Sequence, residues 1–263
     1  MSIPGSYSGY IGSEGLEMIA RITSQVKQQS YDLMQIQPTH RVFDVGCGPA
    51  TDTITLAHLV GSKGQVIGVD YDKEMIDQAN QKADEANVAE WVSHKHLDAT
   101  SLPFENDYFD SGRSDRVFQH LLQPEQVLSE MIRVTKSGGW VVIVDPDHGT
   151  ISIDTPEVDL EQRLLRVRAE KVFNNGFAGR QLYRQFKRQG LEDISIQLFG
   201  LPMTDNTIIR QAGLADRVEK VALETGVITP EELERWRMSL EQADEEGVCF
   251  GSVTLVMVAG RKP

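Results

Sequence analysis

The chain has 263 residues, 40% hydrophobic and 25% charged, so it is long enough to bury a large core without disulfide bonds. Its formal net charge is −13, and so negative a protein is a poor general partner for nucleic acid or anionic membrane surfaces. The two cysteines, Cys47 and Cys249, form neither a disulfide framework nor the spacing of a metal site, so we expect no metal.

The N-terminus lacks a basic stretch followed by an apolar one, and no apolar run approaches the roughly 18 residues of a membrane span. We therefore expect a cytoplasmic protein without a membrane span. The oligomeric state stays open, a homodimer included.

Residues 1–38 are expected to form an N-terminal lid segment with one helix that ends at Pro38. Tyr7 and Tyr10 in this segment are candidates for the substrate pocket, where they would fold over a bound cofactor. The alternative is that both tyrosines belong to a mobile tail.

Short apolar runs alternate with helical patterns from residue 39 to residue 146, which predicts a parallel sheet covered by helices on both faces. Strands are expected at 41–45, 65–70, 91–96, 108–112 and 140–144. Helices are expected at 51–59, 73–86 and from Pro124 to the glycine pair that begins at Gly138.

The remainder of the chain is less regular. Helices are expected at 160–173, at 179–190, around 208–218 and after the capping box formed by Thr229 and Glu232, with strands at 193–198 and 252–259. The helices between residues 200 and 250 must bury their apolar faces, and the nearest surface lies above the sheet edge. We interpret 201–250, with a contribution from 150–180, as a substrate cap.

A glycine turn, Asp44-Val45-Gly46-Cys47-Gly48, follows the first strand and precedes a helix. Glycine permits a sharp turn and a close approach of ligand to backbone, although a simple strand–helix corner is the alternative. Asp70 ends the next strand, where a carboxylate can accept both hydroxyls of a ribose. Thr51 occupies the place of the third glycine that a diphosphate ligand needs, which favours an adenosine ligand without phosphates.

Asp98 and Ala99 follow the third strand, at the same edge of the sheet. The Asp98 carboxylate could accept the adenine amine, and the Ala99 N–H could donate to a ring nitrogen. The alternative is an ordinary loop aspartate.

Four segments together resemble the class I S-adenosylmethionine-dependent methyltransferases, in the branch of small-molecule enzymes similar to UbiE and Coq5. The resemblance covers about residues 38–148. The matching segments are Val42-Phe43-Asp44-Val45-Gly46-Cys47-Gly48, Val66-Ile67-Gly68-Val69-Asp70, Asp98-Ala99-Thr100-Ser101-Leu102-Pro103-Phe104 and Arg133-Val134-Thr135-Lys136-Ser137-Gly138-Gly139.

This resemblance implies a Rossmann-like α/β fold. The implied sheet is doubly wound and seven-stranded with its last strand antiparallel. In the minimal fold of this family a short hairpin joins strands 6 and 7, so the helical cap of this chain is an insertion between them. The core would comprise residues 39–200 and 251–263. The cofactor would be S-adenosylmethionine, and the residues implied to bind it are Asp44, Gly46, Cys47, Gly48, Asp70, Tyr71, Met75, Asp98, Ala99, Arg113 and Ser114.

Methyl transfer from a sulfonium needs alignment and exclusion of water more than a fixed catalytic constellation. His120, just beyond the fourth strand, is a candidate catalytic and pocket residue, with a structural histidine as the alternative. Asp147 and His148 follow the fifth strand at the same sheet edge and are further candidates, with an ordinary turn as the alternative.

The sequence therefore predicts an enzyme that transfers a methyl group from S-adenosylmethionine to an O, N or C atom of a small molecule by in-line displacement. A nicotinamide-dependent oxidoreductase and a non-catalytic S-adenosylmethionine-binding protein are the competing hypotheses. The sequence identifies neither the acceptor nor the use of a general base.

Overall fold

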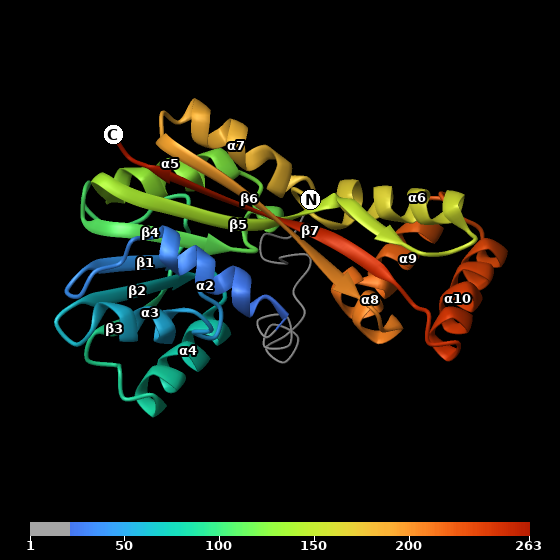
Figure 1. Cartoon of the computed structure of the whole chain (residues 1–263), viewed down its shortest axis with the longest axis horizontal. Coiled ribbons are helices and arrows are strands. Elements are labelled where there is room, and N and C mark those ends of the chain that lie inside the picture. The colour runs from blue at the N-terminus through green and yellow to red at the C-terminus, as the bar shows by residue number, and fades with distance from the viewer. Residues whose placement is uncertain (1–21) are drawn as a thin grey trace.

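The computed structural model describes residues 22–263 (Figure 1). Tyr7 and Tyr10, and with them most of the expected N-terminal lid, lie outside the described residues. The described part begins just before helix α2, Ser24–Leu33, which ends before Pro38 as the sequence predicts.

One seven-stranded sheet runs through the described part of the chain in the order β3-β2-β1-β4-β5-β7-β6. Pairing is parallel from β3 to β5, and β7 is antiparallel to both of its neighbours. The predicted doubly wound sheet with an antiparallel last strand is confirmed. The strands are β1 Arg41–Val45, β2 Gln65–Asp70, β3 Val92–His96, β4 Phe109–Asp115, β5 Thr135–Ile153, β6 Glu192–Met203 and β7 Gly251–Arg261.

Alternating residues of each central strand feed two separate cores, one on each face of the sheet. Val42 packs with α2, α3 and α4 on one face, whereas Phe43 packs with α5 and α7 on the other. This two-sided burial explains why the central strands read as nearly continuous apolar runs. The helices of these two layers are α2, α3 Thr53–Val60, α4 Lys73–Glu85, α5 Pro124–Val134 and α7 Ala178–Arg188.

Strand β5 is far longer than the predicted 140–144, because it continues through Pro146 and Gly149 to Ile153. Strand β7 pairs along this extension, so tertiary pairing overrides the local turn signals. Asp147 and His148 consequently lie within β5, and the prediction that they follow the strand is wrong.

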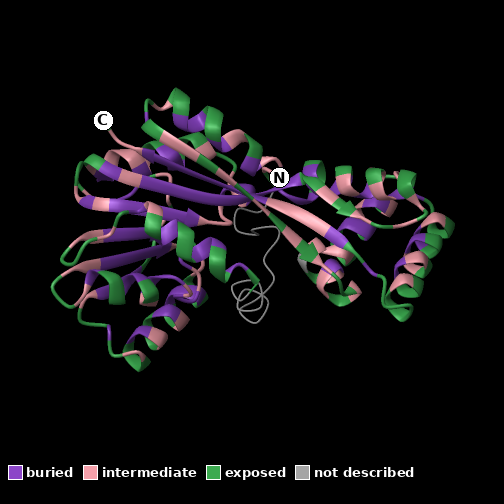
Figure 2. Cartoon of the chain, in the orientation of Figure 1, coloured by how far each residue is buried: buried purple, intermediate pink, exposed green. Residues whose placement is uncertain are grey.

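The far halves of β5, β6 and β7 extend beyond the parallel strands and carry a helical lobe (Figure 1). The lobe buries its own apolar core, which includes Leu164, Trp236 and Leu240. Figure 2 shows buried positions along the helices of the lobe. The predicted helical insert between strands 6 and 7 is confirmed, and the 158–172 region packs with it. The helices of the lobe are α6 Val158–Val167, α8 Asn206–Gly213, α9 Ala215–Glu224 and α10 Pro230–Glu245.

Two local predictions in the lobe need correction. The single helix expected around 208–218 is two helices, because Leu214 adopts a left-handed conformation with φ of 51° between α8 and α9. The helix expected at 160–173 changes at Arg168–Val172 into one π-helical turn, labelled η2. The capping box of Thr229 and Glu232 at the start of α10 is present as predicted.

Candidate cofactor pocket

A pocket of about 370 Å³ lies at the carboxyl ends of β1 to β4. Ligands bind at this edge in open α/β sheets, because loops and free helix N-termini gather there. The residues that line it are Val45, Gly46, Cys47, Gly48, Pro49, Thr51, Asp52, Val69, Asp70, Tyr71, Asp72, Met75, Leu97, Asp98, Ala99, Asp115, Arg116, Val117, His120 and Leu121. Most of the predicted cofactor residues are therefore brought together in one cavity.

The glycine turn forms the floor of this pocket. Gly46 and Gly48 have φ of 72° and 51°, a region that L side chains rarely adopt. A Cβ at Gly46 would also lie only 2.1 Å from Cγ2 of Val117, so the turn has no room for a side chain there. Ala50 adopts a φ of 64° at the place where many proteins of the resembling family have a third glycine. The backbone at this position is thus left-handed although the residue is alanine.

Asp70 joins the glycine turn to the end of β2. Its carboxylate accepts hydrogen bonds from the N–H of Gly48 and from the N–H of Asp72, both at 2.9 Å. Burial raises the pKa of this carboxyl, and the two backbone N–H groups oppose that rise. A carboxylate offers about four acceptor positions, so Asp70 retains acceptor capacity toward the pocket it lines.

Another part of the pocket wall combines aromatic, apolar and acidic groups. Tyr71, Met75 and Ala99 line it, with the Tyr71 ring half-exposed and Met75 buried. Asp98 is exposed and accepts from the backbone N–H of Thr100 at 2.8 Å, in a short turn that orients its carboxylate. These residues can enclose a flat heteroaromatic ring.

Three predicted cofactor residues, Asp44, Arg113 and Ser114, do not line the pocket. Asp44 is 1% exposed and Arg113 is 0% exposed, and the two residues pair with each other in the neighbouring strands β1 and β4, just before the glycine turn. The Ser114 hydroxyl donates to the carbonyl of Val45 at 3.0 Å and thereby ties β4 to β1. In the structure, these three side chains support the glycine turn and do not line the pocket.

Beneath the pocket floor lies a buried cluster of charged groups. Lys27 of α2 contacts Asp52 at 2.6 Å and Asp115 at 2.9 Å, and Arg113 contacts Asp52 at 2.8 Å. These cations hold the pKa values of the Asp52 and Asp115 carboxyls below the ordinary range, against the effect of burial. Asp44 lies farther from Arg113, at 3.8 Å, and burial raises its pKa to about 7.

His120 reaches the pocket from η1, the short 3-10 helix Phe118–His120. The buried Asp145 carboxylate holds the start of this helix by accepting the N–H groups of Phe118 and Gln119, each at 2.8 Å. The imidazole of His120 lies 5.6 Å from the ring of Phe173, measured between ring centres. His120 is thus a pocket residue on a firmly held segment.

Asp147 and His148 do not line the pocket. Asp147 accepts a hydrogen bond from Nε of Arg180 at 2.5 Å and one from the N–H of Gly149 at 3.0 Å. His148 is buried and stacks on Phe173 with 3.9 Å between ring centres. Burial, together with nearby Arg168, holds the pKa of His148 well below its usual value, so its imidazole is neutral.

His148 belongs to a directed chain of hydrogen bonds. Arg168 donates its Nε–H to Nδ1 of His148 at 3.3 Å, so the proton of the neutral ring is on Nε2. Nε2 then donates to Oε1 of Gln119 at 2.7 Å, and the Gln119 amide donates to the carbonyl of Arg116 at 2.9 Å. We call this chain, from Arg168 through His148 and Gln119 to Arg116, the relay. It connects the lobe to a residue that lines the pocket.

Sequence reasoning missed several residues of the pocket wall, among them Asp52, Asp115, Arg116 and Val117. Arg116 has a φ of 59°, and its N–H donates to the carbonyl of Val144 at 2.7 Å, so the chain turns back sharply after β4. The predicted end of β4 at residue 112 was three residues early, which shifted the expected contacts to Arg113 and Ser114. In the sequence, the polar pair Asp115-Arg116 was the signal that could have identified this part of the pocket wall.

Comparison with known proteins agrees with this fold and site. The family described as "Methyltransferase domain" matches residues 36–190, and the chain belongs to this family. The predicted class I S-adenosylmethionine-dependent methyltransferase fold, of the type similar to UbiE, is thereby confirmed.

Among curated proteins, an uncharacterised 37.1 kDa protein of transposon TN4556 from Streptomyces fradiae is 32% identical over 241 residues. That match covers 89% of this chain and 66% of the other. A demethylmenaquinone methyltransferase of Bacillus cereus (strain B4264) is 34% identical over 125 residues, covering 48% of this chain and 52% of the enzyme. The chain thus spans about half the length of the curated methyltransferases it matches.

Among solved structures, the YcgJ protein of Bacillus subtilis superposes with a TM-score of 0.65 at 22% identity. The superposition covers 92% of this chain and 98% of the other. At this identity the likeness concerns the fold alone. Within residues 22–263, no helix is long and apolar enough to cross a membrane.

Proposed function

We propose that this chain binds S-adenosylmethionine in the pocket and transfers its methyl group to a small-molecule acceptor. The charge of the pocket carries this proposal, because five aspartates and one arginine, Arg116, line it. Lys27 and Arg113 pair with two of these aspartates from beneath, and the lining keeps an excess of negative charge. A ligand with a sulfonium and an ammonium group is favoured there, whereas the diphosphate of a nicotinamide cofactor would be repelled. The five are Asp52, Asp70, Asp72, Asp98 and Asp115.

Each lining segment has a proposed role. Gly46, Cys47 and Gly48 would pass beneath the methionine part of the cofactor, with Asp44 holding that turn from below. Asp70 would bind the ribose hydroxyls. The adenine would lie between Tyr71 and Met75, with Asp98 and Ala99 at its edge.

At the methyl end, we assign Asp115 and Arg116 to the wall that the sequence had assigned to Arg113 and Ser114. The bound cofactor supplies a methyl group already activated on a sulfonium, so the protein must align the acceptor in line with it and exclude water. The acceptor's electron pair forms the new bond to the methyl carbon, while sulfur keeps the electrons of the bond that breaks. His120 would take the proton of an acceptor that must lose one.

Asp147 and His148 have a supporting role in this proposal. Both are buried and engaged by Arg180 or by the relay, and neither lines the pocket. The acceptor is proposed only as a small molecule. By its name, the Bacillus cereus relative acts on demethylmenaquinone. Its match covers 48% of this chain and 52% of that enzyme, so its acceptor is not carried over to this chain.

Calorimetric titration with S-adenosylmethionine, S-adenosylhomocysteine and NADH tests the proposal. We expect both sulfur compounds to bind and NADH to produce no heat of binding. Binding of NADH alone would contradict the proposal. Incubation with methyl-labelled S-adenosylmethionine and a metabolite extract then separates an enzyme from a binding protein, because only the enzyme moves label into small molecules.

A further inference from the structure

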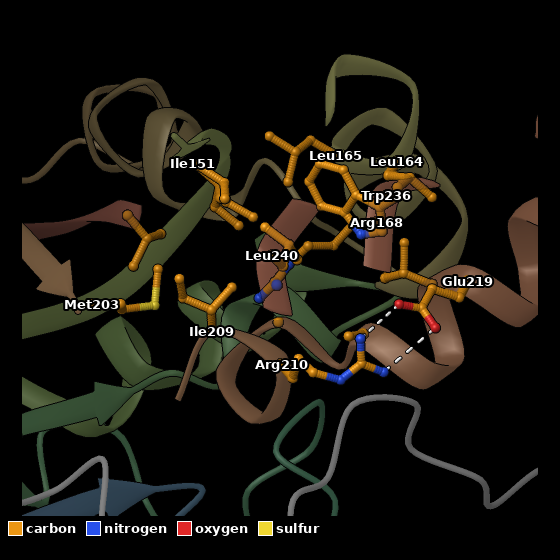
Figure 3. Close-up of a pocket in the computed structure, with 15 residues that line it drawn as sticks. Ile151, Leu164, Leu165, Arg168, Met203, Ile209, Arg210, Glu219, Trp236 and Leu240 are labelled. Carbon is orange, nitrogen blue, oxygen red and sulfur yellow. Dashed lines mark hydrogen bonds and ion pairs between the residues drawn. The ribbon is translucent and has the colours of Figure 1, made fainter. Parts of the chain in front are cut away.

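A second pocket lies inside the helical lobe, where α6, α8, α9 and α10 meet the ends of β5 and β6 (Figure 3). We call it the lobe pocket. Its volume is about 70 Å³, and most of its wall is apolar. Ile151, Leu164, Ile209, Trp236 and Leu240 are among the side chains that line it.

The volume limits what the lobe pocket can hold. An apolar cavity of roughly 150 Å³ accommodates benzene, so about half that volume accommodates a group of roughly three carbon atoms. Empty apolar cavities destabilise a protein, because the surrounding side chains lose contacts that a filled core would provide. A short branched alkyl group matches both the size and the polarity of this cavity.

The charged groups at the outer end of the lobe pocket neutralise one another. Glu219 lines it, and its side chain is 3% exposed. Its carboxylate contacts Arg210 at 2.9 Å and Arg237 at 2.5 Å, and Arg210 also contacts the carboxylate of Asp216 at 2.5 Å, so two carboxylates face two guanidinium groups. Because these partners compensate the buried carboxylate, the outer end offers no excess charge to a ligand, which favours an uncharged group.

Arg168, the first residue of the relay, also lines the lobe pocket. Cζ of Arg168 lies 5.5 Å from the centre of the Phe173 ring, and the His120 ring centre lies 5.6 Å from that same point. The guanidinium and the imidazole are therefore at most about 11 Å apart. Since His120 lines the cofactor pocket, a molecule of ordinary metabolite size is long enough to reach both sites.

From this placement we infer that the lobe pocket binds a short, uncharged alkyl group of the methyl acceptor. The acceptor then extends from Arg168 of the lobe pocket to His120 of the cofactor pocket, two side chains that are at most about 11 Å apart. The inference rests on the proposed methyltransferase function and adds a specificity site to it. It excludes a long apolar chain from the lobe pocket, since such a chain exceeds the available volume.

Xenon is the probe for this pocket, because it enters small apolar cavities without polar contacts. The methyl NMR signal of Met203, which lines the pocket, reports its entry, and the exposed Met238 serves as the reference methyl. We expect xenon to shift the Met203 signal in the wild-type protein and to leave Met238 unchanged. An unshifted Met203 signal overturns the inference.

Two matched variants connect the cavity to methyl transfer. Ala215→Leu adds three carbons to a residue that lines the lobe pocket, whereas Ala243→Leu makes the same change on α10 outside that lining. We expect Ala215→Leu to abolish the xenon shift and to lower label transfer into a metabolite extract at least tenfold relative to Ala243→Leu. Equal transfer by the two variants would sink the inference.

Calorimetry on the same samples separates this inference from the proposed function. S-adenosylmethionine affinity within twofold of wild type in both variants is the expected result. If the cofactor binds and label moves, but Ala215→Leu and Ala243→Leu behave alike, only the lobe-pocket inference fails. If no variant and no wild-type protein binds the cofactor, the proposed function fails, and the acceptor role of the lobe pocket fails with it.

Discussion

Among single residues, Asp70 serves both the fold and the proposed cofactor site. Its carboxylate accepts from Gly48 and Asp72 and so fixes the glycine turn against the start of α4. The spacing between Gly48 and Asp70 was enough to predict that this carboxylate lies at the same edge of the sheet as the glycine turn. The two backbone hydrogen bonds could not be predicted, because they depend on where the turn lies relative to β2.

We predict that Asp70→Ala weakens S-adenosylmethionine binding by about 1–3 kcal/mol, through loss of charge-assisted hydrogen bonds. Calorimetric titration measures the change. Asp77→Ala, on the exposed face of α4, serves as the control and should bind like the wild type. Unchanged affinity in Asp70→Ala would rule out its proposed ribose contact.

For His120→Ala we predict a fall in turnover of roughly a hundredfold or more if the acceptor loses a proton, with cofactor affinity nearly unchanged. His120 lines the pocket from a segment that Asp145 holds in place, so its removal leaves the glycine turn intact. The measurement is kcat together with the dissociation constant of the cofactor. His58→Ala on the surface of α3 is the control. Turnover equal to wild type would assign His120 a structural role only.

At the scale of elements, helix α2 is anchored to the sheet by charge. Its Lys27 contacts both Asp52 and Asp115, and its Tyr31 hydroxyl donates to Asp52. These carboxylates also line the cofactor pocket, so the helix supports the pocket floor. Nothing in the local sequence around Lys27 indicates a buried ion pair, since its partners are 25 and 88 residues away along the chain.

Lys27→Met should therefore lower the free energy of unfolding by about 3–5 kcal/mol, because it leaves buried carboxylates without their cation. Urea denaturation at neutral pH measures this change. Lys73→Met removes an exposed pair with Asp77 and should cost less than about 1 kcal/mol. Similar losses of unfolding free energy in the two variants would show that the buried ion pairs contribute no more to stability than an exposed pair does.

His94 of β3 joins two helices to the sheet edge. Its Nε2 lies 2.8 Å from the Thr53 hydroxyl of α3, and its Nδ1 lies 3.0 Å from the Asn80 side chain of α4. Burial lowers the pKa of this imidazole to about 4. The unfolded chain therefore binds more protons than the folded protein between pH 4 and pH 6.5, and the stability falls as the pH falls through that range.

From this linkage we predict that His94→Gln reduces the loss of stability between pH 7 and pH 5 by about 2 kcal/mol. The comparison uses the change in unfolding free energy of each protein between the two pH values, so the other titrating groups cancel. Parallel pH profiles for wild type and His94→Gln would show that the buried imidazole titrates normally.

On the scale of the whole molecule, the net charge of the protein and the acidic residues of the pocket favour the same kind of ligand, a cation. The net charge is −13, and carboxylates outnumber cationic groups among the residues that line the pocket, so the field attracts a cationic cofactor. We predict that raising the salt concentration from about 50 to 500 mM weakens S-adenosylmethionine binding severalfold, because salt screens this attraction. S-adenosylhomocysteine, which lacks the sulfonium charge, should weaken less. Equal salt dependence would count against charge selection by the pocket.

The sequence by itself determined the order of strands and helices, the glycine turn and the acidic residues that follow β2 and β3. These depend on local periodicity and on spacing, both of which are written along the chain. It also predicted a helical insert between the last two strands, and the capping box at Thr229.

Only the tertiary structure decided the features that depend on distant partners. Strand β5 runs to Ile153 because β7 pairs with it, which placed His148 inside a strand and within the relay. The glycine turn is supported by Arg113 and Lys27 from elements far apart in sequence. The lobe pocket likewise exists only where side chains from several elements meet, since packing of distant segments has no signature in local pattern.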